Sequence, residues 1–172
     1  MKKEKLVFLD ESGVNTNMTR FYGRAKGKKR VYEYVPARRT KRTTLLSSVR
    51  LDGTIARKVF QGALTGEIFL DYVKNILVPT LHKGDIVIMD NLSCHKVKGV
   101  KEAIETVGAS VLYLPPYSPD LNPIEMTWSK IKALLRKWKA RSSELLDLYI
   151  SNAFSAVTTE NIEHWFSDCG YC

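Results

Sequence analysis

The sequence predicts an α/β fold in which a mixed five-stranded sheet is flanked by helices. Two unbroken apolar runs, residues 6–9 and 86–89, have the pattern of short strands that are buried on both faces. Between residues 67 and 81, by contrast, apolar side chains recur at helical spacing. Three meandering strands followed by alternating strands and helices are typical of a mixed sheet covered by helices.

The first part of the chain supplies the three antiparallel strands of this prediction. A turn rich in glycine and lysine, residues 23–29, follows the first strand, and residues 31–35 form a further short extended segment. The break at Asp52-Gly53 between two strand patterns predicts a hairpin. The three strands are predicted at residues 6–9, 43–51 and 54–60.

The second part of the chain predicts alternation of helix and strand. Pro115-Pro116 ends the last strand, because proline cannot donate to a sheet ladder. The long helix that follows begins near Pro123, and we expect Trp128 and Trp138 of its apolar stripe in the core. The predicted elements are helix 67–81, strand 86–89, helix 97–107, strand 111–114, the helix from 123, and helices 142–157 and 159–166.

Length and composition narrow the class of protein. A chain of 172 residues with 44% hydrophobic and 26% charged residues is typical of one globular domain, which we assign to residues 1–172. No apolar run approaches the roughly 20 residues that a transmembrane helix needs, and no signal peptide is recognisable. Three cysteines are too few for a disulfide scaffold. We therefore expect a cytoplasmic protein with no membrane partner.

The net charge of +9 is concentrated in one segment. Residues 20–42 contain ten basic residues and one acid, and residues 130–141 contain six basic residues and no acid. Two basic clusters in a small domain indicate a polyphosphate partner, although a solvated surface is the alternative. Tyr22, Tyr32 and Tyr34 lie within the first cluster, where they could stack on bases or pack on the core. The candidate nucleic-acid-binding residues are Arg24, Lys26, Lys28, Lys29, Arg30, Arg38, Arg39, Lys41, Arg42, Lys130 and Lys132.

Two buried strands of the prediction end in an aspartate. Asp10 follows the first strand and Asp90 follows the strand 86–89, so both would lie at the carboxyl end of the sheet, where ligands bind in α/β folds. Converging carboxylates repel each other unless a cation lies between them. The pair therefore indicates a metal site, whereas Glu11 and Asp120 are interpreted as turn residues.

Glu125 is the third candidate ligand, and it has a structural alternative. Asn122 is a good N-cap, Pro123 suits the first helical position, and Glu125 falls where a capping box needs an acid. On this local evidence a cap and a metal ligand are equally good interpretations. Three carboxylates suit Mg²⁺ or Mn²⁺, and two such ions can activate a water or a 3′-hydroxyl in phosphodiester chemistry.

Three sequence blocks resemble the catalytic domain of bacterial insertion-sequence transposases of the mariner superfamily, the DDE type related to retroviral integrases. The blocks are Leu9-Asp10-Glu11-Ser12, Met89-Asp90-Asn91-Leu92-Ser93-Cys94-His95, and the twelve residues from Leu114 to Glu125. The resemblance extends from Leu6 to Phe166. It implies a ribonuclease H-like fold, DNA cleavage and strand transfer during transposition.

The resemblance also implies roles for individual residues. Asp10, Asp90 and Glu125 would be the acidic triad that binds two Mg²⁺ or Mn²⁺ ions, and Asn91 and His95 would support it. We expect His95 to be a hydrogen-bonded structural residue rather than a base. Relatives carry an N-terminal helix-turn-helix part that reads transposon ends, which we expect on a separately or upstream-encoded polypeptide.

The remaining expectations concern partners and alternatives. Double-stranded DNA, both transposon ends and target, is the expected partner, a homodimer is the expected assembly, and the expected location is the bacterial or archaeal cytoplasm, at the nucleoid. Two other functions fit the same residues: a structure-selective nuclease or RNA-hybrid hydrolase on the same fold, and a DNA-binding protein without catalytic activity.

Overall fold

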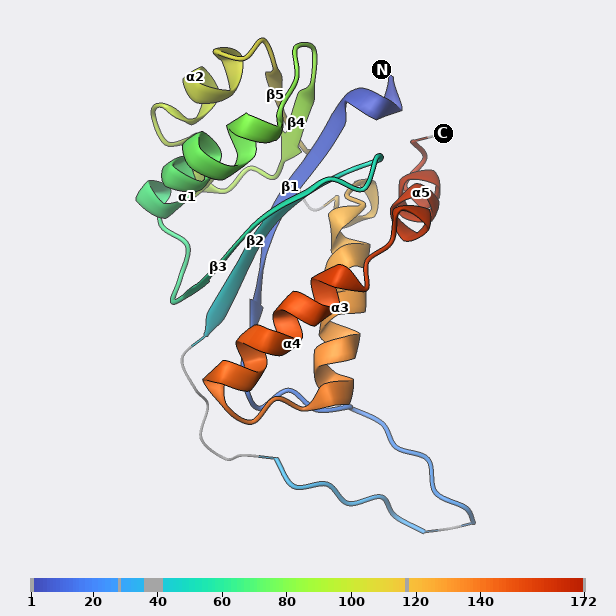
Figure 1. Ribbon diagram of the computed structural model, residues 1–172. Coiled ribbons are helices and arrows are strands. Elements are labelled where there is room, and N and C mark those ends of the chain that lie inside the picture. Colours follow the sequence, from blue (N-terminus) through green and yellow to red (C-terminus); the bar gives the residue numbers. More distant parts are fainter. Residues whose placement is uncertain (1, 28, 36–41, 117, 172) are drawn as a thin grey trace.

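The computed structural model describes residues 2–27, 29–35, 42–116 and 118–171. One five-stranded sheet with helices on both faces forms the body of the protein (Figure 1). The sheet order is β3-β2-β1-β4-β5, with β1, β2 and β3 antiparallel and β1, β4 and β5 parallel. The predicted mixed five-stranded sheet is therefore confirmed. The strands are β1 (Leu6–Val14), β2 (Thr43–Arg50), β3 (Ile55–Gln61), β4 (Ile86–Met89) and β5 (Ser110–Tyr113).

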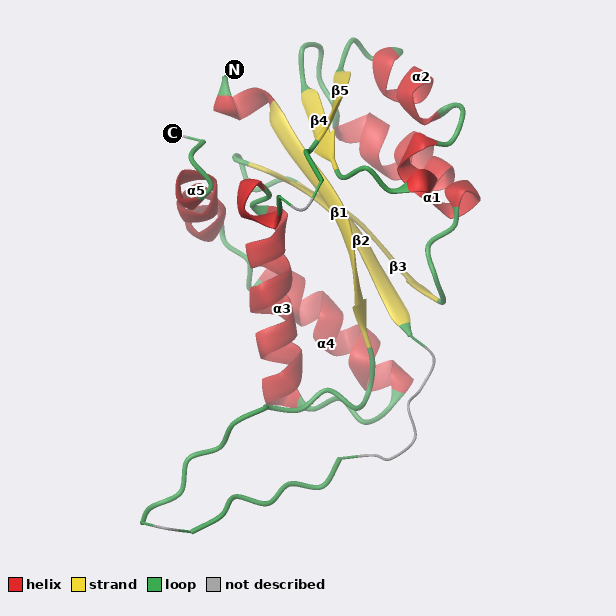
Figure 2. Ribbon diagram, turned by 180° about the vertical axis from the view of Figure 1, so that it is seen from behind, coloured by secondary structure: helices red, strands yellow, loops and turns green. Residues whose placement is uncertain are grey.

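Helices cover the two faces of the sheet in separate groups (Figure 2). The first predicted helix is a composite, because its α-helical start passes into a π turn (Val73–Leu77) and a 3₁₀ turn (Val78–Thr80). No helix of the described residues is long and apolar enough to span a bilayer. One face carries α1 (Gly66–Tyr72) and α2 (Val100–Glu105), and the other carries α3 (Ile124–Trp138), α4 (Ser143–Ser155) and α5 (Thr159–Asp168).

The apolar run that begins β1 serves two cores. Val7 and Leu9 belong to the core beneath α1 and α2, whereas Leu6 and Phe8 belong to the core beneath α3, α4 and α5. All four side chains are almost completely buried. Successive residues of a strand point to opposite faces, so a strand covered on both sides needs the unbroken apolar run seen in the sequence.

The parallel register of β1 and β4 decides where two of the predicted site residues lie. Leu6 pairs with Ile86 and Phe8 pairs with Ile88. Asp10 and Asp90 follow in the same register, at the carboxyl end of β4. Their positions therefore follow from strand pairing and not from the loops that follow.

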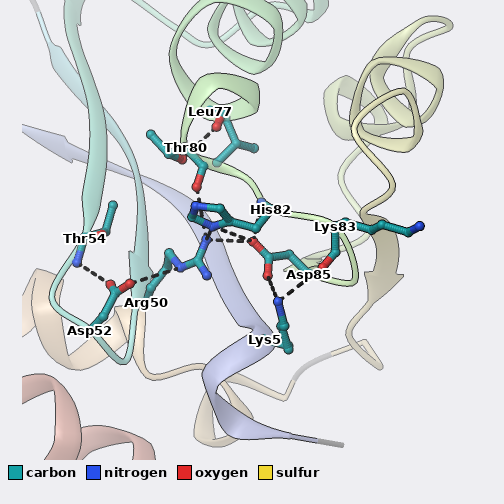
Figure 3. A network of polar contacts seen from close by, with 9 residues as sticks. All are labelled: Lys5, Arg50, Asp52, Thr54, Leu77, Thr80, His82, Lys83 and Asp85. Carbon is teal, nitrogen blue, oxygen red and sulfur yellow. Dashed lines mark hydrogen bonds and ion pairs between the residues drawn. The ribbon is translucent and has the colours of Figure 1, made fainter.

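A buried ion pair ties three strands together at the opposite end of the sheet (Figure 3). Arg50 Nη1, at the end of β2, donates to Asp85 Oδ2 at 2.7 Å and to the Thr80 carbonyl at 3.1 Å. Asp85 precedes β4, is fully buried, and also accepts from the His82 N–H at 2.8 Å. Its other oxygen lies 3.5 Å from Lys5 Nζ, just before β1. Because β1 lies between β2 and β4, this network fixes the ends of all three strands.

Residues 15–42, which we call the arm, join β1 to β2, and the described part of the arm projects beyond the end of α3 (Figures 1 and 2). The described residues of the arm contain no strand. Tyr22, Tyr32 and Tyr34 are 91%, 82% and 98% exposed, so the alternative in which they pack on the core is wrong. The contacts of this part of the arm with the end of α3 are instead made by Glu33 and Phe21.

Basic residues at the end of α3 hold the base of the arm. Arg141 Nη1 donates to the carbonyls of Thr16 and Met18, both at 2.9 Å. Lys139 forms an ion pair with Glu33 on the returning segment. Part of the second basic cluster is thus used to position the arm.

Candidate active site

A cleft of about 440 Å³ lies at the carboxyl end of β4, beside the middle of β1. The three predicted carboxylates, Asp10, Asp90 and Glu125, all line it, although they come from β1, the loop after β4 and the first turn of α3. The remaining lining residues are Asn91, Leu92, Leu114, Pro115, Pro116, Ser118, Pro119 and Asn122.

Asp10 is the most buried of the three carboxylates and is oriented by a tryptophan. Trp128 Nε1, on α3, donates to Asp10 Oδ2 at 3.0 Å. Burial, the nearby charge of Glu11 and the charge of Glu125 together raise the pKa of Asp10 to about 7, against the opposing effects of hydrogen bonds from the Glu11 backbone and Trp128. The sequence predicted only a core role for Trp128. Its position three residues after Glu125 was the available signal, because residues three apart lie on one side of a helix.

The pKa of Asp90 is shifted in the opposite direction to that of Asp10. Its Oδ1 accepts from the Leu92 N–H at 3.0 Å and lies 2.7 Å from His95 Nδ1. Burial alone would raise the pKa of Asp90, but the contacts with His95 and Leu92 outweigh it and lower the pKa. Asp90 is therefore ionised where Asp10 is poised between its two forms.

His95 is fully buried between two carboxylates. Its Nε2 lies 3.2 Å from Glu11 Oε2, and its ring packs on Phe69 with centroids 4.4 Å apart. Burial lowers the pKa of His95, but the contacts with Asp90 and Glu11 outweigh it and raise the pKa to about 9. His95 is thus an imidazolium at neutral pH that bridges β1 and the loop after β4. Glu11 lies within β1, so its interpretation as a turn residue was wrong.

Asn91 supports the same loop from the other side. Its Nδ2 donates to the Leu114 carbonyl at 2.6 Å, which links the loop after β4 to the end of β5. Both residues line the cleft. Asn91 therefore helps to set the position of Asp90 through the backbone that the two residues share.

The structure tests the capping-box interpretation of Glu125. Helix α3 begins without any side-chain cap, and the first-turn bond runs from the Glu125 N–H to the Asn122 backbone carbonyl at 3.0 Å. The Asn122 side chain is buried, and its Oδ1 has no hydrogen-bond partner among the described residues. The capping-box interpretation is therefore wrong, and the Glu125 side chain remains exposed in the cleft.

The donor chemistry of the cleft fits a hard divalent cation, although the spacing leaves room for other ligands. In the part of the chain that the structure describes, no three His, Cys, Asp or Glu side chains are grouped closely enough to hold a metal ion by themselves. Mg²⁺ usually keeps several waters and binds through one or two carboxylates together with substrate phosphates. Asp10, Asp90 and Glu125 would supply the protein's oxygen ligands in such a site.

The candidate nucleic-acid-binding residues separate into distinct groups. Arg24, Lys26, Lys29 and Arg30 are exposed on the arm, and Lys28, Arg38, Arg39 and Lys41 lie outside the described residues. Arg42 and Lys132 line a second cavity beside β1. Lys130 instead contacts Asn161 at the start of α5. At 100° per residue, Lys130 lies about 140° around the axis of α3 from Glu125. The structure thus places Lys132, and not Lys130, at the second cavity.

Comparisons with known proteins identify similar sequences and folds. Residues 5–148 match a family described as DDE superfamily endonuclease. A pre-cleavage Mos1 transpososome superposes with a TM-score of 0.78 at 18% identity, over 96% of this chain and 53% of that chain. The Mos1 mariner paired end complex with Mn superposes with a TM-score of 0.74 at 19% identity, over 95% of this chain and 52% of that chain. The catalytic domain of Mos1 mariner transposase superposes with a TM-score of 0.67 at 18% identity, over 95% of this chain and 76% of that chain.

The likeness to these structures shows a shared fold. The chain spans about half the length of the first two Mos1 chains. No curated protein matches the chain. The ribonuclease H-like fold that the sequence blocks implied is confirmed by the sheet order and by these superpositions.

Proposed function

The chain belongs to the DDE superfamily endonucleases, and from this premise we propose that it is the catalytic domain of an insertion-sequence transposase. Asp10, Asp90 and Glu125 are its catalytic carboxylates; they would hold two Mg²⁺ or Mn²⁺ ions, which would supply the chemistry that cleaves and joins DNA strands. The convergence of these three side chains on one cleft, from three distant segments, is the observation that carries the proposal.

The protein's own part in this reaction is to hold each carboxylate in place. Divalent ions bound by the three carboxylates would activate a water or a 3′-hydroxyl and stabilise the leaving oxygen. Trp128 orients Asp10 through a single hydrogen bond, and His95 orients Asp90 through its Nδ1. Because Glu125 makes no capping bond, it is free to turn toward a cation.

His95 acts as a positioning residue. Both of its ring nitrogens face carboxylates, and its side chain is fully buried, so it cannot reach a substrate directly. Its positive charge partly offsets the negative charge of Asp90 and Glu11. This arrangement supports the structural role over a role as general base.

Double-stranded DNA is the proposed substrate and partner. The exposed basic residues of the arm can contact phosphates without sequence preference, and its exposed tyrosines can stack on bases. The Mos1 structures include a complex with the left transposon end and a strand transfer complex. By analogy we propose a homodimer acting at the nucleoid on two transposon ends, with a separate helix-turn-helix part that reads their sequence.

A DNA-nicking assay with matched variants tests the proposal. Incubation with supercoiled DNA and Mn²⁺ should give nicked product, and Asp10→Asn, Asp90→Asn and Glu125→Gln should each abolish it. Asp120→Asn, an exposed carboxylate near the cleft, should leave the rate unchanged. An unchanged rate in any of the first three variants would remove that residue from the triad.

A nuclease or RNA-hybrid hydrolase on the same fold is the alternative function. Both reactions begin with hydrolysis of a phosphodiester, so nicking alone does not separate them. A transposase also joins a DNA 3′ end to a second duplex, which a hydrolase does not do. Covalent joining of a labelled pre-cleaved end to a target plasmid would support the transposase, and hydrolysis without any joining would support the alternative.

A further inference from the structure

Three cavities follow one another along β1, from the acidic cleft toward the base of the arm. The second cavity, of about 530 Å³, lies beside residues 11–15 and is flanked by Arg42 and Lys132. The third, of about 290 Å³, shares residues 13–15 and Lys132 with the second. It continues to Phe21, whose ring packs 4.7 Å beneath the Arg136 guanidinium. The line of cavities therefore leads from carboxylates to basic side chains.

The line of three cavities, which we call the groove, follows an open edge of the sheet. β4 pairs with β1 only at residues 6–8, whereas β2 pairs with residues 7–14. Beyond Asp10, no described strand pairs with β1 on the side where β4 lies. The extended chain from Asp10 to Asn15 spans about 17 Å. At the 3.4 Å rise of duplex DNA, this length accommodates about five nucleotide steps.

Gly13 lets an arginine lie directly on β1. A Cβ atom at Gly13 would stand 2.4 Å from Arg42 Nε and 2.8 Å from Arg42 Cζ. Gly13 is not among the residues with positive φ, so its backbone would accept other amino acids. The space taken by the Arg42 side chain is what restricts this position, and any larger residue would displace the guanidinium.

Lys132 faces the groove from the other side. It lies seven residues, or two helical turns, after Glu125, so α3 presents both on the same face. In the described part of the chain, neither Lys132 nor Arg42 forms an ion pair, in contrast to Lys139. Glu11, the carboxylate that lines the second cavity, faces His95. The second cavity thus contains two cations that form no ion pair with a described carboxylate.

We propose that this groove binds the phosphate backbone of the DNA strand that enters the cleft, with Arg42 and Lys132 contacting its phosphates and Gly13 acting as a positioning residue for Arg42. The inference rests on the proposed function and assigns to it a path for the substrate. Guanidinium and ammonium groups are the usual phosphate partners, and the acidic cleft lies at one end of the path.

Binding measurements with the full chain test this path. The probe is a fluorescein-labelled DNA duplex in EDTA, followed by fluorescence anisotropy at several salt concentrations. Arg42→Ala and Lys132→Ala should each weaken binding about tenfold, as expected for loss of one charged hydrogen bond. Each should also reduce the slope of log K against log salt by about 0.9. Lys137→Ala, an exposed lysine on another face of α3, is the matched control and should have little effect.

Gly13 gives the most specific test. Gly13→Ala should reproduce the effect of Arg42→Ala, and the double variant should bind no more weakly than either single variant, because both remove the same contact. Circular dichroism verifies folding, and Arg42→Met tests the contact without changing the strand. Full affinity in Gly13→Ala and Arg42→Met, or an equal loss in Lys137→Ala, would overturn the inference. Absence of nicking by the parent protein would instead count against the proposed function.

Discussion

Replacing Asp10 by asparagine should stabilise the metal-free protein while abolishing its activity. Asp10 is buried near Glu11 and Glu125, and its pKa of about 7 compares with an ordinary value of 3.8. A carboxyl group whose pKa is higher in the folded state than in the unfolded state reduces the free energy of unfolding as the pH rises from the unfolded-state pKa to the folded-state pKa. At 1.36 kcal/mol per pKa unit, ionised Asp10 costs about 4 kcal/mol above pH 7. Asparagine avoids this cost and can still accept the Trp128 hydrogen bond.

Urea unfolding in EDTA measures the effect directly. The free energy of unfolding of Asp10→Asn should exceed that of the parent by about 2 kcal/mol at pH 5 and by about 4 kcal/mol at pH 8, because the parent loses stability between these pH values. Asp120→Asn should show no such difference. Mg²⁺ at 100 times its Kd should stabilise the parent by about 2.7 kcal/mol and the Asp10→Asn variant by less. A variant no more stable than the parent at pH 8 would refute the reasoning.

Three further predictions follow from contacts of the cleft and of the sheet. Trp128→Phe removes a donor to Asp10, so the pH midpoint of Mn²⁺-dependent nicking should rise by about one unit; an unchanged profile would contradict this role. Asp85→Leu leaves the buried Arg50 charge with only the exposed Asp52 carboxylate, 3.7 Å from its Nε, as an ionic partner, which should cost about 3–5 kcal/mol in urea unfolding, whereas adding Arg50→Met should recover most of it. His95, with its pKa raised from 6.5 to about 9, contributes about 3 kcal/mol below pH 6.5 that is lost as pH rises through 9. His95→Gln should therefore be destabilising at pH 6 and nearly neutral at pH 10, and a pH-independent difference would exclude the linkage.

Local patterns were sufficient for most of the fold because they report burial. The apolar runs before Asp10 and Asp90 predicted strands buried on both faces, and the periodicity after Pro123 predicted α3. The same patterns could not predict that the arm leaves the body of the protein. Whether Tyr32 and Tyr34 are buried depends on whether another element lies beside them, which no local pattern records.

The acidic triad was predicted from the sequence, whereas its electrostatics required the structure. Glu125 had two equally good local interpretations, and the start of α3, which has no side-chain cap, excluded the capping box. Glu11 resembled a turn residue because nothing near it in the sequence indicated that His95 would lie opposite. Trp128 resembled a core residue, and its indole N–H met Asp10 only through packing of α3 on β1.

The sequence by itself determined the strand and helix pattern and the basic character, and it predicted Asp10, Asp90 and Glu125 as the site carboxylates, because these depend on residue type and short-range spacing. The tertiary structure decided which carboxylate has a raised and which a lowered pKa, which lysine of α3 lines the second cavity, and why position 13 is glycine. These properties depend on side chains that are distant in sequence and adjacent in space. Burial and neighbouring charge set pKa values and open grooves only once the chain has folded.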